Sequence, residues 1–145
     1  MKYTLAILAI LSLTACGEPR ILNAGAAVPV TAVDGPNMDR ISGSYDVVGR
    51  YQRDAGVSPH IYLLSGSERE STFCHELAHM ADDNGGDYAA AIRSVTPPNP
   101  TARFAERIKV AWEIAHTPGG YWKAIYERWG DEGVEHKEIL AKIKN

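Results

Sequence analysis

Residues 67–86 read SERESTFCHELAHMADDNGG, and this stretch decides the fold. Ser67 and Glu70 fit a capping box, in which a hydroxyl caps a helix and a carboxylate three residues later returns the bond. An apolar sequence follows, and the Asn-Gly-Gly sequence at 84–86 is typical of the point where a helix ends. The stretch therefore predicts a helix from Ser67 to about Asp83.

Two histidines lie on one face of this predicted helix. His75 and His79 are four residues apart, so their imidazoles project toward the same point about one turn apart. That is the geometry for two ligands of one tetrahedral Zn²⁺. Glu76 would lie beside the metal, where its carboxylate can accept a proton from a zinc-bound water and deliver it to a leaving amine. The alternative interpretation is a salt-bridged helix face with two surface histidines.

The sequence HELAH at residues 75–79 resembles the HExxH zinc metallopeptidases, or zincins. The metzincin pattern is absent, because Asp82 and Gly85 occupy the positions of its glycine and third histidine. In gluzincins a glutamate on a later helix is the third ligand, and Glu113 is the candidate here. His116 stands where many gluzincins have an acidic residue, which is a departure from that pattern. Four alternative third ligands stay open: Glu106, Asp83, Asp87 and His116.

The resemblance implies an α+β, mostly helical domain with a short strand or small sheet. It covers residues 45–116 as a helix, a strand, the HExxH helix and a glutamate helix. The predicted elements are helices at 44–54, 101–116, 121–129 and 134–144, a short helical turn at 88–94 and a strand at 60–64. The strand precedes the HExxH helix, as does the zincin edge strand that holds a substrate backbone.

Several other residues of this region have two interpretations. Cys74 points away from His75 around the helix and is expected to be a small buried core residue. Tyr121, Trp122, Tyr126 and Trp129 recur at helical spacing and indicate core. Either tyrosine could instead donate a hydrogen bond to a tetrahedral oxyanion.

The N-terminus carries a second motif. Residues 4–15 (TLAILAILSLTA) form an apolar run after Lys2, shorter than the roughly 20 residues of a spanning helix and typical of a secretory signal peptide. The run ends in LTAC at 13–16, which resembles the lipobox of bacterial lipoproteins. The resemblance implies removal of residues 1–15, a lipid on Cys16 and a membrane-anchored protein of the cell envelope. Gly17 in place of Asp favours the outer membrane, facing the periplasm, in a Gram-negative cell. The alternatives are an ordinary signal peptide or a buried N-terminal helix.

Length and composition restrict the remaining possibilities. The chain has 145 residues, 45% of them hydrophobic, which indicates one folded domain rather than disorder. Its net charge of −3 argues against nucleic-acid binding. Residues 16–40 are expected to be the lipidated cysteine and a flexible tether, and residues 41–145 the zincin-like domain.

These observations lead to two hypotheses of different kinds. The first is a membrane-tethered zinc metallopeptidase that hydrolyses peptides or proteins, with His75, His79 and Glu113 as zinc ligands and Glu76 as general base. The second is a non-catalytic envelope lipoprotein that serves as a binding or assembly module, with or without structural zinc. An open coordination position beside a substrate groove distinguishes the first from the second.

Overall fold

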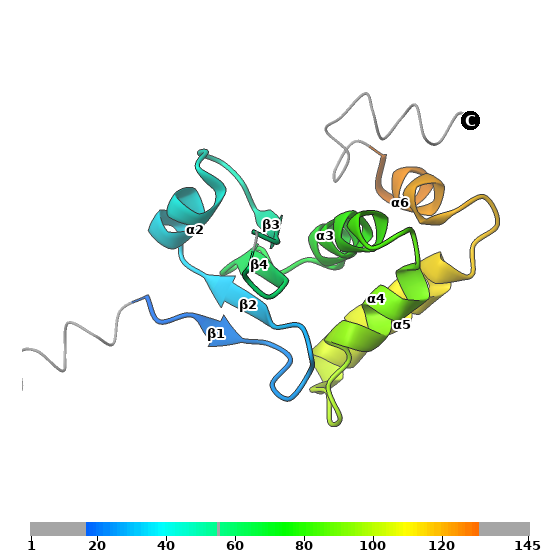
Figure 1. Cartoon of the computed structure of the whole chain (residues 1–145), viewed down its shortest axis with the longest axis horizontal. Coiled ribbons are helices and arrows are strands. Elements are labelled where there is room, and N and C mark those ends of the chain that lie inside the picture. Colours follow the sequence, from blue (N-terminus) through cyan, green and yellow to red (C-terminus); the bar gives the residue numbers. More distant parts are fainter. Residues whose placement is uncertain (1–16, 55, 131–145) are drawn as a thin grey trace, which may run out of the picture.

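A computed structural model describes residues 17–54 and 56–130 of the chain. Its strands and helices, in chain order, are β1 (Arg20–Ile21), β2 (Val30–Val33), α2 (Gly35–Ser42), β3 (Gly49–Gln52), β4 (His60–Leu64), α3 (Glu70–Asp83), α4 (Tyr88–Val95), α5 (Ala102–Ala115) and α6 (Tyr121–Trp129). The strands and α2 lie on one side of the molecule, and α3 to α6 lie on the other (Figure 1). The expected α+β, mostly helical fold class is confirmed.

The four strands form one mixed sheet in the order β1-β2-β4-β3. β2 and β4 are parallel, with Val30 opposite Ile61, and the two outer pairs are antiparallel. Along β4 the burial alternates, so that Ile61 and Leu63 belong to the core that the helices cover. In the described part of the chain, β3 is thus an outer strand and β4 an inner one.

Helix α3 lies at the centre of the core. Its side chains Phe73, Leu77 and Ala78 are fully buried, and the Phe73 ring meets Phe104 of α5 edge to face at 5.4 Å. Cys74 is also fully buried, as the sequence predicted, and burial raises the pKa of its thiol to about 12. Because α3 contacts β3, β4, α4, α5 and α6, the histidine pair stands on a rigid platform.

The expected flexible tether is wrong for residues 20–40. Val30–Val33 is a strand in the interior of the sheet with all four residues buried, and α2 follows it directly. A strand buried on both faces shows a continuous apolar run rather than alternation. The stretch from Val28 to Val33 therefore lacks the period that would identify it, and the folded part begins before residue 41.

The helix expected over residues 44–54 is also wrong. Asp46 has a φ of 62°, in the left-handed region, and residues 49–52 form strand β3. The spacing of Tyr45, Val48 and Tyr51 that suggested a helix has no common buried face, because Tyr45 is 83% exposed and Val48 43%.

The later elements agree closely with the sequence-based expectations. β4 and α6 have the predicted bounds, α5 begins after a Thr101 cap, and α3 ends at Asp83. The capping box is wrong, because α3 begins at Glu70 and its N-cap residue, Arg69, makes no side-chain capping bond. The helix expected at 134–144 and the lipobox cysteine lie outside the described residues.

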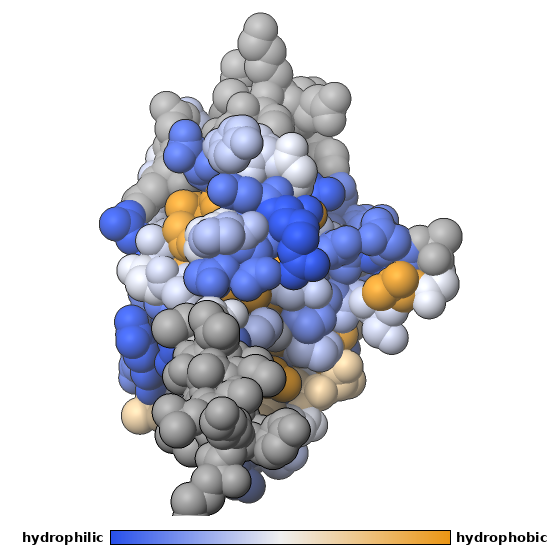
Figure 2. All heavy atoms as spheres, turned by 90° about the vertical axis from the view of Figure 1, so that its left-hand side faces the viewer, coloured by the Kyte–Doolittle hydropathy of each residue, from blue (hydrophilic) through white to orange (hydrophobic). Residues whose placement is uncertain are grey.

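The surface on the sheet side is largely hydrophilic, with small isolated apolar areas (Figure 2). Among the described helices, none has the length and apolar character needed to cross a membrane.

Candidate metallopeptidase site

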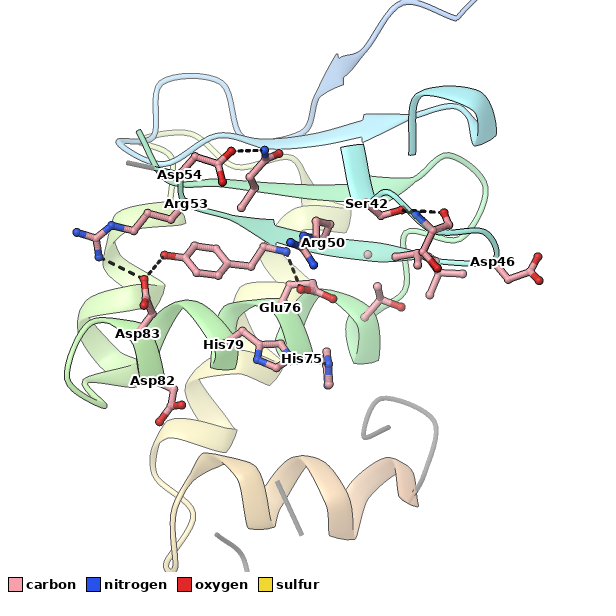
Figure 3. A pocket seen from close by; sticks show the side chains of 17 residues that line it. Ser42, Asp46, Arg50, Arg53, Asp54, His75, Glu76, His79, Asp82 and Asp83 are labelled. Atoms are coloured by element: carbon pink, nitrogen blue, oxygen red, sulfur yellow. Dashed lines mark hydrogen bonds and ion pairs between the residues drawn. The ribbon is translucent and has the colours of Figure 1, made fainter. Parts of the chain in front are cut away.

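A groove is lined by β3 and its flanking residues on one side and by one face of α3 on the other. Its cavity volume is about 600 Å³. The α3 side chains that line it are Thr72, His75, Glu76, His79, Asp82 and Asp83, and the opposite wall is formed by residues 42, 44 and 46–54. The three residues of the HExxH motif thus share one concave surface (Figure 3).

The two imidazoles converge as the helical spacing predicted. Nε2 of His75 lies 3.0 Å from Nε2 of His79, and the ring planes are nearly perpendicular at 83°. Two nitrogens bound to a tetrahedral zinc at about 2.05 Å lie about 3.3 Å apart. The observed separation differs from that of a shared zinc by only a few tenths of an ångström.

Trp122 of α6 covers the side of the pair that faces the helices. The centroid of its ring lies 5.0 Å from that of His79 and 5.8 Å from that of His75, both in edge-type contacts. The next residue back, Tyr121, places its hydroxyl 3.4 Å from Oδ1 of Asp82. Burial, together with the charge of Asp82, raises the pKa of Tyr121 to about 12, so the phenol stays protonated and is a hydrogen-bond donor.

Glu76 points from α3 toward β3 (Figure 3). Its Oε2 accepts a hydrogen bond of 2.7 Å from the backbone N–H of Tyr51, and the residue is only 8% exposed. The approach is close because Gly49 has no side chain. A Cβ on Gly49 would lie 2.6 Å from Cγ2 of Thr72 and 3.0 Å from Oε1 of Glu76. The edge strand and the helix therefore fix the position of the carboxylate together.

The outer edge of β3 presents backbone groups to the groove. The N–H of Leu64 donates to the carbonyl of Val48, so Val48 and, two residues on, Arg50 occupy hydrogen-bonded positions in the antiparallel ladder with β4. Gly49 and Tyr51 then direct their N–H and C=O groups to the opposite, outer edge. The bond from Tyr51 N–H to Glu76 agrees with this direction.

The groove strand is thus β3, not the strand at 60–64 that the sequence suggested. β4 pairs on both sides, with β2 and with β3, so its backbone groups are used within the sheet. The expectation is wrong because β3 lies within residues 44–54, for which the sequence predicts a helix.

Two side chains of β3 and its flank also hold the strand to α3. The Tyr51 hydroxyl donates to Oδ2 of Asp83 at 2.9 Å, and Arg53 Nη1 lies 3.3 Å from the same oxygen. Partial burial and Asp83 raise the pKa of the Tyr51 phenol above its ordinary value. Asp83 therefore has a structural role at the end of the groove.

The structure does not bring Glu113 to the histidine pair. Its half-exposed carboxylate accepts from Arg128 Nη1 of α6 at 3.1 Å. Among residues 17–54 and 56–130, no three His, Cys, Asp or Glu side chains are grouped closely enough to hold a metal ion.

The four alternative third ligands also lie elsewhere or have other partners. Asp83 is bound to Tyr51 and Arg53, and Asp87 caps α4 by accepting from Ala90 N–H at 2.8 Å. His116 is the C-cap of α5, with Nδ1 2.7 Å from the carbonyl of Trp112, and Glu106 is exposed on α5.

The groove carries an excess of negative charge. Five carboxylates and two guanidiniums line it; they belong to Asp46, Asp54, Glu76, Asp82, Asp83, Arg50 and Arg53. One guanidinium, that of Arg53, is paired with Asp83. Such a surface attracts divalent cations and basic segments of a ligand.

Three features of the site were missed in the sequence: the Tyr51 N–H bond to Glu76, the contact at Gly49 and the cover by Trp122. A glycine inside a strand often marks a close backbone approach, and Gly49 would have given that signal had the strand been identified. The other two features are contacts between distant segments, for which no local pattern exists. Comparisons of the chain with protein-family models, with curated proteins and with solved structures found no match.

Proposed function

We propose that this protein is a zinc-dependent metallopeptidase, tethered to a membrane through a lipid on Cys16. One observation carries the enzymatic part of the proposal. The converging imidazoles of His75 and His79 and the carboxylate of Glu76 lie in one groove, beneath the outer edge of a β-strand. A salt-bridged surface helix would not bury Glu76 against a backbone N–H.

The substrate backbone would bind along β3. The outward N–H and C=O of Gly49 and the C=O of Tyr51 can pair with an extended peptide by strand addition. Such pairing fixes the main chain of the substrate and places a peptide carbonyl beside the α3 residues. Because it uses backbone groups, it selects for an extended peptide rather than for one side chain.

In this proposal His75 and His79 would hold Zn²⁺. Zinc bound there would lower the pKa of a water molecule and polarise the scissile carbonyl. Glu76 accepts the proton of the attacking water and returns it to the nitrogen of the leaving amine. Tyr51 N–H holds that carboxylate in place, and Trp122 limits the movement of both imidazoles.

Glu113 is the third ligand in this proposal, and its recruitment requires a rearrangement. Its carboxylate must leave Arg128, and α5 or the Glu113 side chain must move toward α3. An exposed ion pair of this kind stabilises a protein by about 0–1 kcal/mol, so breaking it costs little. A movement of the whole helix would also disturb the buried contacts of Phe104, Ile108 and Ala111.

The charge of the groove indicates the class of peptide. Five carboxylates line the groove and Arg53 is already paired, so a peptide with basic residues near the cleaved bond fits better than an acidic one. The competing hypothesis is a non-catalytic lipoprotein with the same groove, which would bind such peptides without cleaving them.

A comparison of the original protein with one variant distinguishes the peptidase from the non-catalytic binding module. The full chain and its Glu76→Gln variant are loaded with zinc, and metal content and cleavage of a basic extended peptide are measured. We expect both proteins to bind zinc and only the original to cleave, with at least about 10²-fold loss in the variant because the general base is removed. Cleavage that survives in Glu76→Gln would refute the mechanism, and zinc binding without cleavage in either protein would support the binding module.

The lipid anchor is tested separately. Expressed in a Gram-negative host, the protein should partition with membranes, with a mass that corresponds to lipid on Cys16 and loss of residues 1–15. Cys16→Ser should prevent both changes. Unlipidated wild-type protein that retains residues 1–15 would contradict the anchor and leave the peptidase proposal intact.

A further inference from the structure

A second, smaller cavity of about 280 Å³ lies between β1 and the first turns of α5. Its lining is Arg20, Ile21, Leu22, Glu68, Thr101, Arg103, Phe104 and Arg107. Three of these eight residues are arginines and one is acidic. We call this cavity the arginine pocket. It shares no residue with the groove of the histidine pair.

Arg107 is the most unusual of the three arginines, because it is only 5% exposed. Its Nη2 donates to the backbone carbonyl of Glu68, and within the described residues it forms no ion pair. Burial, followed by the charge of Arg103, lowers the pKa of Arg107. A guanidinium has five N–H donors and stays charged in proteins, so burying it without an ion-pair partner costs free energy. An anion in the adjoining cavity would lower that cost.

Acidic residues offset the cost of burying Arg107 only in part: the charges of Glu68 and Glu70 favour the charged form of Arg107, but within the described residues neither forms an ion pair with it. Glu68 accepts from Arg20 Nη2 at 2.5 Å and from Gly66 N–H at 2.9 Å. Burial opposes its ionised form, but the backbone N–H bonds and the charges of Arg20 and Arg103 outweigh burial and lower its pKa. Among the lining residues one carboxylate therefore faces three guanidiniums, and its shortest bond is to Arg20. Glu70, outside the lining, adds a second negative charge near Arg107.

Arg103 adds to the imbalance. It is exposed, lines the pocket one turn before Arg107 on α5, and makes no ion pair with the described part of the chain. Like charges four residues apart on a helix repel each other. An anion bound between the two guanidiniums would attract both of them and offset their mutual repulsion.

We propose that Arg20, Arg103 and Arg107 form a binding site for a phosphate group, and that the group belongs to the headgroup of an anionic phospholipid. Guanidinium forks match phosphate oxygens in geometry as well as in charge. The pocket is open enough for Arg20, whose side chain is 63% exposed, to reach a ligand from outside.

The position of Arg20 in the chain selects a lipid over free phosphate. Arg20 is the fourth residue after Cys16, and four residue steps span at most about 14 Å. If Cys16 carries a lipid, Arg20 and with it the β1 wall of the pocket lie about that distance or less from the membrane surface. This choice of lipid rests on the anchor proposed above, whereas the phosphate site itself rests on the arginines alone. Ile21, also in the pocket and 58% exposed, gives an apolar contact for the same surface.

The site would also orient the enzyme. β1 and β3 are the two outer strands of the sheet, three strand spacings or about 14 Å apart. With the β1 edge held to headgroups, the groove along β3 would open away from the membrane. A peptide in the surrounding solution could then reach the histidine pair.

The test uses the full chain in a non-ionic detergent, with thermal unfolding followed by circular dichroism. Three probes are titrated at constant ionic strength: dihexanoylphosphatidylglycerol, dihexanoylphosphatidylcholine and inorganic phosphate. We expect the anionic lipid to raise the unfolding midpoint, since a ligand that binds the folded state stabilises it. The zwitterionic lipid and inorganic phosphate should have much smaller effects at the same concentration.

Arg103→Gln is the decisive variant, because Arg103 is exposed and its removal breaks no bond that the structure shows. Its affinity for the anionic lipid should fall by about ten-fold or more, since a charge-assisted bond is lost. Arg93→Gln, at an exposed arginine of α4 outside the pocket, is the matched control and should bind normally.

Three results would overturn the proposal. Equal effects of inorganic phosphate and the anionic lipid would show a free-phosphate site. Equal weakening in both variants would show non-specific attraction, and no stabilisation by any probe would remove the site. None of these results changes the mass of the lipid on Cys16 or the cleavage assay, so the other proposals are judged independently.

Discussion

Gly49→Ala should destabilise the protein through one identifiable contact. The added Cβ would lie 2.6 Å from Cγ2 of Thr72 and 3.0–3.1 Å from the Oε1 and Cγ atoms of Glu76, so β3 and α3 must separate. Overpacking of this kind costs about 1–3 kcal/mol. For a chain of this size that corresponds to a fall of roughly 3–12 °C in the unfolding midpoint. The displaced carboxylate should also reduce peptide cleavage.

The assay is a thermal unfolding curve for each variant, supported by the cleavage rate. Gly35→Ala is the matched control, because a Cβ there meets no atom within 4 Å. Thr72→Ser removes the Cγ2 atom that makes the closest contact, so the double variant Gly49→Ala, Thr72→Ser should recover much of the lost stability. The reasoning is refuted if Gly49→Ala unfolds at the same temperature as Gly35→Ala, or if Thr72→Ser does not rescue it.

Two further predictions concern Glu113 and His60. Glu113→Gln should weaken zinc binding about ten-fold or more in a competition titration. Arg128→Gln breaks the same ion pair but leaves the carboxylate, so it should not weaken zinc binding. Unchanged zinc affinity in Glu113→Gln would show that Glu113 is not a ligand. His60, with Nε2 2.7 Å from the hydroxyl of Thr31, has its pKa lowered by burial, so the unfolded chain binds its proton more readily. The free energy of unfolding should therefore be highest, as far as His60 is concerned, above pH 6.5 and should decline as the pH falls below that value. A series of denaturant titrations at different pH values should show a smaller decline for His60→Gln.

The helices that cover the core were predictable because each carries its own signal. In α5, Phe104, Ile108 and Ala111 recur at helical spacing and are buried, and Thr101 caps the first turn through a bond from Phe104 N–H. Such signals lie within one turn of the residues that they order. The predicted bounds of α6 match the structure, and those predicted for α5, residues 101–116, differ by one residue at each end.

The first strands were not predictable, because their order comes from distant partners. Val30–Val33 becomes a strand through its parallel pairing with β4, about 30 residues away, and Asn23 fixes the preceding loop by donating to the carbonyls of Val28 and Val95. β3 is four residues long and, among the described strands, pairs with β4 alone. A short strand with mixed burial gives no clear period.

The same distinction applies to the candidate site. His75 and His79 were found from the sequence because the α-helix itself brings residues four apart together. The placement of Glu76 depends instead on a backbone N–H of Tyr51, which has no residue-type signature, and on the missing side chain of Gly49, whose meaning is readable only once β3 is known to be a strand. The convergence of the two imidazoles therefore depends on the geometry of α3 alone. The position of the Glu76 carboxylate depends on the contact between β3 and α3. A substitution at Gly49 should thus disturb the position of Glu76 while the two Nε2 atoms stay together, which makes zinc affinity and cleavage rate separable measurements.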